Sequence, residues 1–341
     1  MLLLAAFAAA SFLSCSKEEN GVAEKSAIGF HCADVQTKAL VSEAADMFDG
    51  FEVYAHATFE STGSTYSFNR TVTNEGSGWN YVTPEYWIPG GAYTFRAYFP
   101  AEFPATINEV SPVEYTIQDF EITPQYGTQT DILMANAART TAETATLGTT
   151  VPFTFSHLLS NLNVTLKVGT IEREVEVEKK DENGDPVLDA DGNPVMETIT
   201  ETINALDAVI KAVAFNGVAQ KADYNGSWIN HAGTTAIGDN MKSEVVVVPE
   251  GVQIFGEDGL LTIPEILAAG DVSLYILADI TLPTGTTMQK DWTINIPAIT
   301  WAPNTKYNYT ATLTADFNIE FEEPKVESWG QEQMSGTVII R

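Results

Sequence analysis

The chain has 341 residues, of which 44% are hydrophobic, and its 46 acidic residues against 17 basic residues give a formal net charge of −29. This length predicts about two domains, and the hydrophobic content suffices for packed cores. The charge repels polyanions and so excludes nucleic acid as a partner, while two cysteines, Cys15 and Cys32, are too few for a disulfide framework or a thiolate metal site.

An apolar run from Leu2 to Leu13 opens the chain, and the polar residues Ser16 to Asn20 follow Cys15. The run is too short to span a bilayer as a helix but has the length of a secretory signal. We therefore predict a lipoprotein signal peptide at residues 1–14, with lipid on Cys15 holding the mature protein to the outer membrane, and a tether at residues 15–26. The alternative is a buried N-terminal segment with an incidental cysteine.

Short runs of β-branched and aromatic residues dominate the chain from residue 51 onwards. In Phe51 to Phe59, every second residue is apolar, which is the period of a half-buried strand. Runs of the same kind, each closed by Gly, Pro, Asn or Asp, lie at 66–72, 93–99, 151–155, 162–168, 208–215, 272–280, 292–296 and 307–313. Helical patterns are brief, and only Val41 to Met47 and Leu133 to Ala138 are expected to supply a few turns.

This distribution predicts an all-β protein built from antiparallel sandwiches, because parallel sheets need crossover helices that the sequence does not offer. We expect two tandem antiparallel β-sandwich domains of transthyretin-like or Greek-key topology. Residues 137–150 contain few large apolar side chains and indicate a linker. The predicted domains are therefore residues 27–145 and 150–341.

An insertion at residues 171–203 interrupts the second domain. Its two arms alternate glutamate with apolar residues, and between them lie the turn dipeptides Asn183-Gly184 and Asp191-Gly192. This pattern predicts a projecting β-ribbon. The Asp-rich tip departs from the EF-hand template, so we expect solvated turns there, with calcium binding as the open alternative.

No constellation in the sequence indicates catalysis, a metal site or a cofactor. The four histidines are scattered, and there is neither a nucleophile elbow nor a phosphate-binding loop. His157, within an apolar stretch, is expected to fill a hydrogen-bonded structural position. Trp79, Trp87, Trp292 and Trp301 lie in or beside predicted strands, which favours the core over a sugar-binding platform.

Several phrases, in this order along nearly the whole mature chain, resemble the fimbrillin family, which supplies subunits and accessory proteins of type V pili. They are Ile28-Gly29-Phe30, Thr37 to Ala39, Trp79 to Pro100, Asp131 to Ala135, Val151 to Leu162, Trp301 to Tyr309 and Trp329. The resemblance implies a two-domain, non-enzymatic lipoprotein that is exported to the cell surface and built into a fimbria with other pilus subunits. It also implies adhesion to a ligand on a host or bacterial surface.

Assembly in this family is understood as strand exchange. An N-terminal strand, here near Ile28 to Thr37, fills a groove until a trypsin-like protease removes it, and a donor strand of another subunit replaces it. Our cleavage candidate is Lys38-Ala39, and our donor candidate is Thr337, Val338, Ile339 and Ile340, which alternatively form an ordinary last strand. Two other functions stay open: a surface glycan-binding lipoprotein, and a lipoprotein enzyme.

Overall fold

The computed structural model describes residues 26–35, 50–74, 79–101, 106–107, 115–140 and 150–329. Within these ranges the regular structure consists of β-strands without a helix, which confirms the all-β prediction. It follows that no described segment is an apolar helix of membrane-spanning length.

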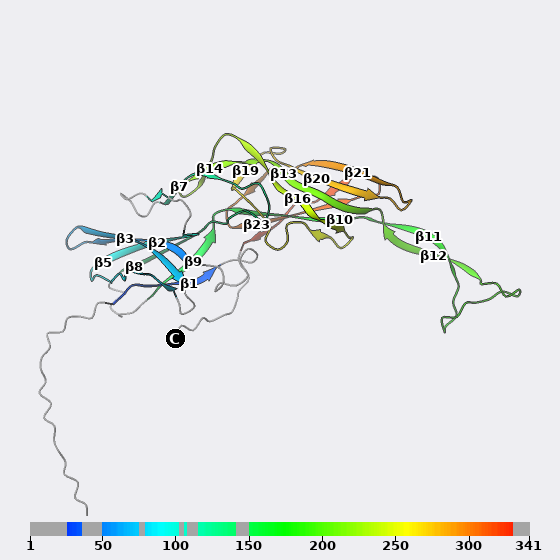
Figure 1. Cartoon of the computed structure of the whole chain (residues 1–341), viewed down its shortest axis with the longest axis horizontal. Coiled ribbons are helices and arrows are strands. Elements are labelled where there is room, and N and C mark those ends of the chain that lie inside the picture. Colours follow the sequence, from blue (N-terminus) through cyan, green and yellow to red (C-terminus); the bar gives the residue numbers. More distant parts are fainter. Residues whose placement is uncertain are drawn as a thin grey trace, which may run out of the picture.

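A seven-stranded sheet forms one end of the molecule (Figure 1). Its strands, from edge to edge, are β1 (Gly29–Val35), β9 (Thr150–His157), β8 (Leu133–Thr140), β5 (Gly91–Phe99), β2 (Gly50–Phe59), β3 (Ser64–Asn74) and β4 (Trp79–Asn80). The predicted alternation in Phe51 to Phe59 is confirmed, since Phe51, Val53 and each second residue after them are buried. These side chains pack with Phe95, Phe153 and their neighbours into one apolar core.

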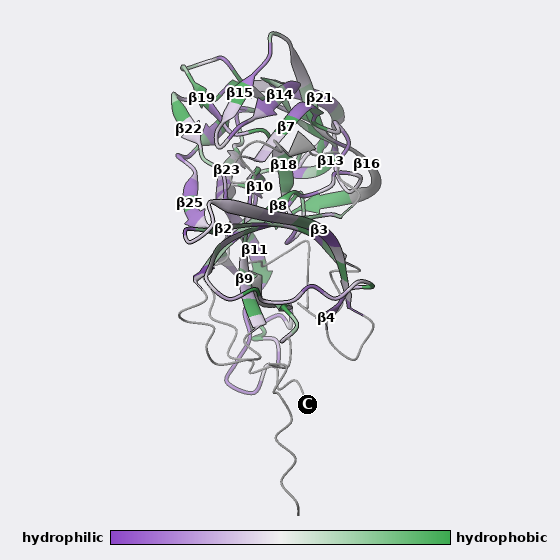
Figure 2. Cartoon of the chain, turned by 90° about the vertical axis from the view of Figure 1, so that its left-hand side faces the viewer, coloured by the Kyte–Doolittle hydropathy of each residue, from purple (hydrophilic) through white to green (hydrophobic). Residues whose placement is uncertain are grey.

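The remaining strands form several smaller sheets around a second, larger core. The first comprises β16 (Thr234–Val247), β13 (Asp207–Ala219), β20 (Ser273–Thr281) and β21 (Thr287–Asn295). The second comprises β17 (Val252–Gln253), β18 (Leu260–Thr262), β10 (Ser160–Val168), β23 (Thr305–Leu313), β24 (Ile319–Phe321) and β25 (Lys325–Ser328). A third comprises β6 (Thr106–Ile107), β7 (Tyr115–Glu121), β14 (Lys221–Tyr224) and β15 (Trp228–Asn230). A two-stranded sheet pairs β19 (Glu265–Leu267) with β22 (Ile299–Trp301), and a further two-stranded sheet is described below. Seen end-on, the seven-stranded sheet curves beneath these strands (Figure 2).

Hydrogen bonds between strands do not follow the predicted boundary near residues 145–150. β7 lies before it but pairs with β14, whereas β9 lies after it but pairs with β8 and β1. The sheets are mainly antiparallel, as predicted, and two long pairings, β1 with β9 and β10 with β23, are parallel. Both parallel pairs join strands far apart in sequence, so intervening strands take the place of crossover helices. The two domains, residues 27–145 and 150–341, thus stay a prediction.

The prediction of helical turns at Leu133 to Ala138 is wrong. This segment is most of β8, which pairs with β5 along its whole length. Its alanines favour a helix locally, but Leu133 and Ala135 enter the core only when side chains alternate. Tertiary packing therefore overrides local propensity here. The other expected turns, at Val41 to Met47, lie outside the described residues.

The projecting ribbon is confirmed. β11 (Thr170–Glu178) and β12 (Met196–Asn204) form a two-stranded antiparallel sheet that extends from the end opposite the seven-stranded sheet (Figure 1). Gly184 and Gly192 at its tip have φ of 85°, which glycine adopts readily. The side chains of Asp181 and Asp189 each accept two backbone N–H groups of their own turn.

His157 occupies the structural position that was expected of it. The ring is buried, and its Nδ1 bonds to the carboxylate of buried Asp131. The His157 ring stacks face to face on the Trp329 ring, with centroids 3.6 Å apart. The backbone N–H of Trp329 donates to the Asn304 carbonyl at 2.9 Å. The end of the described chain is thereby fixed where β9 meets β23.

Candidate functional site

The site residues predicted from the sequence lie outside the described ranges. These are the lipidation candidate Cys15, the cleavage candidates Lys38 and Ala39, and the donor candidates Thr337, Val338, Ile339 and Ile340. What the structure does describe is the part of the N-terminal strand that precedes Lys38. The position occupied by residues 26–30, which we call the N-terminal strand site, is therefore the candidate functional site.

The main chain of this segment is held from two sides. On one side, β1 runs parallel to β9, with Gly29 beside Thr150 and Phe30 beside Val151. On the other side, Ala27 forms an antiparallel bridge with Tyr86. The N–H of Ile28 donates to the Glu85 carbonyl at 2.7 Å, and the N–H of Trp87 donates to the Ser26 carbonyl at 3.0 Å.

Two side chains of the segment enter the core of the seven-stranded sheet. Ile28 is 1% exposed and Phe30 is 3% exposed. The Phe30 ring contacts the rings of Tyr81, Phe95 and Phe153, with centroids 5.4, 5.8 and 6.0 Å away. Gly29, between them, has no room for a side chain without movement, since a Cβ there would lie 2.6 Å from the Thr150 methyl group.

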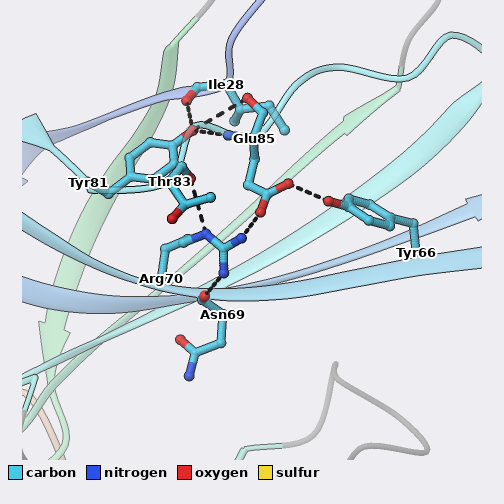
Figure 3. Close-up of polar contacts among 7 residues, drawn as sticks. All are labelled: Ile28, Tyr66, Asn69, Arg70, Tyr81, Thr83 and Glu85. Carbon is cyan, nitrogen blue, oxygen red and sulfur yellow. Dashed lines mark hydrogen bonds and ion pairs between the residues drawn. The ribbon is translucent and has the colours of Figure 1, made fainter.

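Tyr81 connects the segment to the loop that covers it (Figure 3). Its hydroxyl donates to the Ile28 carbonyl at 2.6 Å and accepts the Glu85 N–H at 3.0 Å. Burial raises the pKa of this phenol to about 12, despite the opposing effect of the Arg70 charge. Tyr81 therefore keeps its proton for the Ile28 carbonyl at every physiological pH.

Glu85 anchors the same loop to β3. One carboxylate oxygen pairs with the Arg70 guanidinium, and the other accepts a hydrogen bond from the Tyr66 hydroxyl (Figure 3). Arg70 also donates to the carbonyls of Thr83, at 3.2 Å, and Asn69, at 2.6 Å. Because Arg70 and Glu85 each form several of these bonds, the loop presents its main chain to residues 26–28 in a defined position.

The contacts of Arg70, Tyr81 and Glu85 were not predicted from the sequence. Tyr81 and Glu85 fall within the stretch from Trp79 to Pro100 that resembles fimbrillins, but no spacing rule joins them to Arg70 on a different strand. The one available signal is that Glu85 is an acidic residue directly before two aromatic residues, Tyr86 and Trp87. A charge there requires a partner.

Among the residues that the structure describes, one group of three could hold a metal ion: Asp119, Asp223 and His231. Nε2 of His231 lies 3.1 Å from Asp223, and Nδ1 lies 3.8 Å from Asp119. The two ring nitrogens thus face different carboxylates, which is the arrangement of an imidazole that bridges two acids. The Asp119 N–H and the His231 ring both lower the pKa of Asp223.

The tryptophans named in the sequence pack against the cores, as predicted. Trp87 and Trp301 are buried, while Trp79 and Trp292 are half-buried against apolar neighbours. The Trp292 N–H donates to the Phe317 carbonyl at 2.9 Å. None of the six tryptophans, all of which are described, is largely exposed: three are buried and three are half-buried.

Comparison with known proteins identifies the fold and the family. The chain shares its fold with a fimbrial protein from Bacteroides vulgatus, with a TM-score of 0.63 at 18% identity over 89% of this chain and 99% of that one. A "putative cell adhesion protein" from Bacteroides uniformis matches with a TM-score of 0.45 at 17% identity, over 91% of this chain and 99% of that one. The search of curated proteins found no match. A family model described as fimbrillin-like matches residues 37–329, which is most of the chain, and the protein therefore belongs to the fimbrillin-like family.

Proposed function

We propose that the protein is a non-enzymatic subunit of a cell-surface fimbria that acts in adhesion and is assembled with other pilus subunits by strand exchange. Membership of the fimbrillin-like family and the fold shared with a fimbrial protein support the fimbrial role. Lipid on Cys15 would hold the precursor at the outer membrane, since several acyl chains anchor a protein firmly.

The N-terminal strand site is the observation that carries the strand-exchange proposal. Its bonds to residues 26–28 use main-chain groups of that segment, so another extended chain can make them equally well. The side-chain contribution is concentrated in Ile28 and Phe30. Burial of two such side chains stabilises the docked strand by roughly 3 to 6 kcal/mol, which a donor strand with two apolar residues at the same spacing can replace.

The C-terminal tail has residues suited to this exchange. In the donor candidate, Val338 and Ile340 are two residues apart, as are Ile28 and Phe30. Alternate side chains of a strand point to the same face, so both would enter the vacated core. Ile339 would then stand in place of Gly29, and the exposed Thr150 side chain would have to turn away from it.

Trypsin treatment of the purified protein tests this proposal. Cleavage after Lys38 would separate β1 from the rest of the chain, whereas cleavage after Lys25 would leave β1 attached. We therefore expect polymers in the electron microscope from the wild type and from Lys25→Gln. Lys38→Gln should stay monomeric. Intact mass identifies the cut, and cleavage after Lys38 that yields monomers under all conditions would refute assembly by strand exchange.

A separate measurement addresses the anchor. Cys15→Ala removes the thiol that would carry the diacylglycerol, so this variant is expected to leave the outer-membrane fraction. Surface accessibility to protease and fractionation would be compared with Cys32→Ala, which keeps the proposed lipid site. A Cys15→Ala protein that still fractionates with the outer membrane would contradict lipid anchoring at Cys15. The strand-exchange proposal would not be affected by that result.

A further inference from the structure

The projecting ribbon has an open edge that the rest of the described chain does not cover. β11 and β12 pair in one register from Thr170–Asn204 to Glu178–Met196, and within the described ranges β11 has no other strand partner. The ribbon joins the body at its root, where Gly169 donates to the Leu313 carbonyl at 2.8 Å. Beyond that root, the ribbon extends away from the body, and no other described strand pairs with it (Figure 1).

The phase of the ladder shows which backbone groups point outwards. Near the root, the Ala205 N–H donates to the Gly169 carbonyl, and near the tip the Lys179 N–H donates to the Val195 carbonyl, each at 2.8 Å. In an antiparallel pair, alternate residues make these bonds. The odd-numbered residues of β11 therefore bond to β12. The even-numbered residues turn their N–H and C=O groups to the open edge, and these are Thr170, Glu172, Glu174, Glu176 and Glu178.

The two faces of the ribbon differ in chemistry. One face carries β-branched apolar residues that are half-buried or exposed, namely Ile171, Val175, Val177, Ile199 and Ile203. The other face carries the four glutamates of β11 opposite Thr198, Thr200 and Thr202 of β12. At the root, a hollow of about 330 Å³ lies between Arg173 and Ile203 of the ribbon and Leu206, Asp207 and Thr281 of the body.

The charge of the ribbon indicates the chemistry of what would cover it. Residues 170–204 contain eleven acidic and three basic residues, a net charge of −8. A second copy of the chain would bring its own net charge of −29 to the same place, so like charges would oppose its docking. The same negative charge favours the docking of a basic segment of a different protein.

We propose that the open edge of β11 is a docking site for an extended segment of another protein in which apolar and basic residues alternate. The segment would add a third strand and bond to the outward N–H and C=O groups of Glu172, Glu174 and Glu176. Its basic side chains would lie beside the glutamates on one face. Its apolar side chains would extend the row that includes Val175 on the other, since neighbouring strands bring facing side chains within about 5 Å.

The competing explanation is that the glutamates only guard an exposed edge against aggregation, which charged edge residues do in many sheets. Two proline variants separate these explanations. Glu174→Pro removes an outward N–H of β11 and leaves the bonds to β12, because proline is tolerated where the N–H faces solvent. Thr200→Pro does the same on the outer edge of β12 and is the matched control. Glu174→Thr removes the charge but keeps the N–H.

The experiment measures binding of a short, capped, fluorescent peptide of alternating lysine and valine to the full chain by anisotropy. A peptide of the same composition, with lysines and valines in separate blocks, controls for charge. We expect the alternating peptide to bind the wild type and Thr200→Pro alike, at least about tenfold more weakly to Glu174→Pro, and about threefold more weakly to Glu174→Thr. Circular dichroism verifies that each variant is folded.

Three results would overturn the docking site. The first is absence of binding to the wild type, which leaves edge protection as the role of the glutamates. The second is equal weakening by Glu174→Pro and Thr200→Pro. The third is equal binding of the alternating and the block peptide, which would show attraction to net charge without any added strand.

Discussion

The N-terminal strand and the ribbon strand β11 are both edge strands, yet the molecule holds them by opposite means. At the start of β1, the side chains of Ile28, just before the strand, and Phe30, within it, are buried in the core. A loop also forms hydrogen bonds to the main chain at this point. Within the described part of the chain, β11 pairs with one strand, and none of its side chains is buried. Burial therefore supplies most of the free energy that holds the first strand, whereas local cross-strand pairs hold the second.

Truncation of the buried ring should show the largest difference between these two strands. Phe30→Ala removes a ring packed against Tyr81, Phe95 and Phe153, so we expect it to lower the free energy of unfolding by about 3 to 5 kcal/mol. Ile199→Ala, on the half-exposed face of the ribbon, should lower it by less than about 1 kcal/mol. Urea unfolding followed by tryptophan fluorescence measures both, and similar losses would contradict the comparison.

The half-buried carboxyl group of Glu265 in the body gives the next largest effect, and this effect depends on pH. Burial raises the pKa of Glu265 from 4.5 to about 7, which outweighs the lowering by the N–H of Ala219 at 3.2 Å. The folded protein thus holds this proton more tightly than the unfolded chain. The associated stabilisation is complete below the unfolded pKa and is lost as pH rises through about 7.

Glu265→Gln is the variant that isolates this effect. Relative to it, the wild type should lose on the order of 2 kcal/mol of unfolding free energy between about pH 5 and about pH 8. Urea unfolding at both values gives the difference, and the Gln variant serves as the neutral reference. A wild type whose stability changes with pH in parallel with Glu265→Gln would show that the carboxyl group is not responsible.

The polar contacts that hold the loop over β1 should contribute a similar amount. Glu85→Ala leaves the Arg70 guanidinium and the Tyr66 hydroxyl without their shared partner, and we expect a loss of about 2 kcal/mol. Glu85→Gln, which keeps one acceptor, should lose less. A double-mutant cycle with Arg70→Met measures the coupling energy between Arg70 and Glu85 separately from their other contacts. Additive effects of the two single changes would contradict a stabilising ion pair between them.

The strands were predictable where one residue class repeats locally. Phe51 to Phe59 alternates clearly enough to fix both the strand and its buried face, and the ribbon arms show the same period. Leu133 to Ala138 failed because alanine-rich segments suit a helix until neighbouring strands decide otherwise. Neither the parallel partner of β1 nor the position of β7 beside β14 leaves a local pattern, since both join residues about a hundred positions apart.

The candidate site was predictable only in part, for a related reason. The resemblance to fimbrillins predicts an N-terminal strand near Ile28 to Thr37, and the structure has β1 at Gly29–Val35. The bonds that position it come from Tyr81 and Glu85, whose partners are set by the path of the loop over β3. Such contacts depend on where the loop crosses β3, and neither the composition nor the spacing of residues predicts that position.

The smallest expected effect belongs to the ribbon and completes the contrast with β1. Arg173 and Glu201 face each other across the ladder, with Nη2 and Oε2 2.9 Å apart and both side chains about half exposed. An exposed pair of this kind contributes about 0.2 to 0.5 kcal/mol because water screens it and two long side chains lose freedom. A double-mutant cycle with Arg173→Met and Glu201→Gln measures the coupling, which should fall further at about 1 M salt. A coupling as large as that of Arg70 with Glu85 would mean that the ribbon shields its charges from solvent, and the contrast between a buried and an open edge strand would then fail.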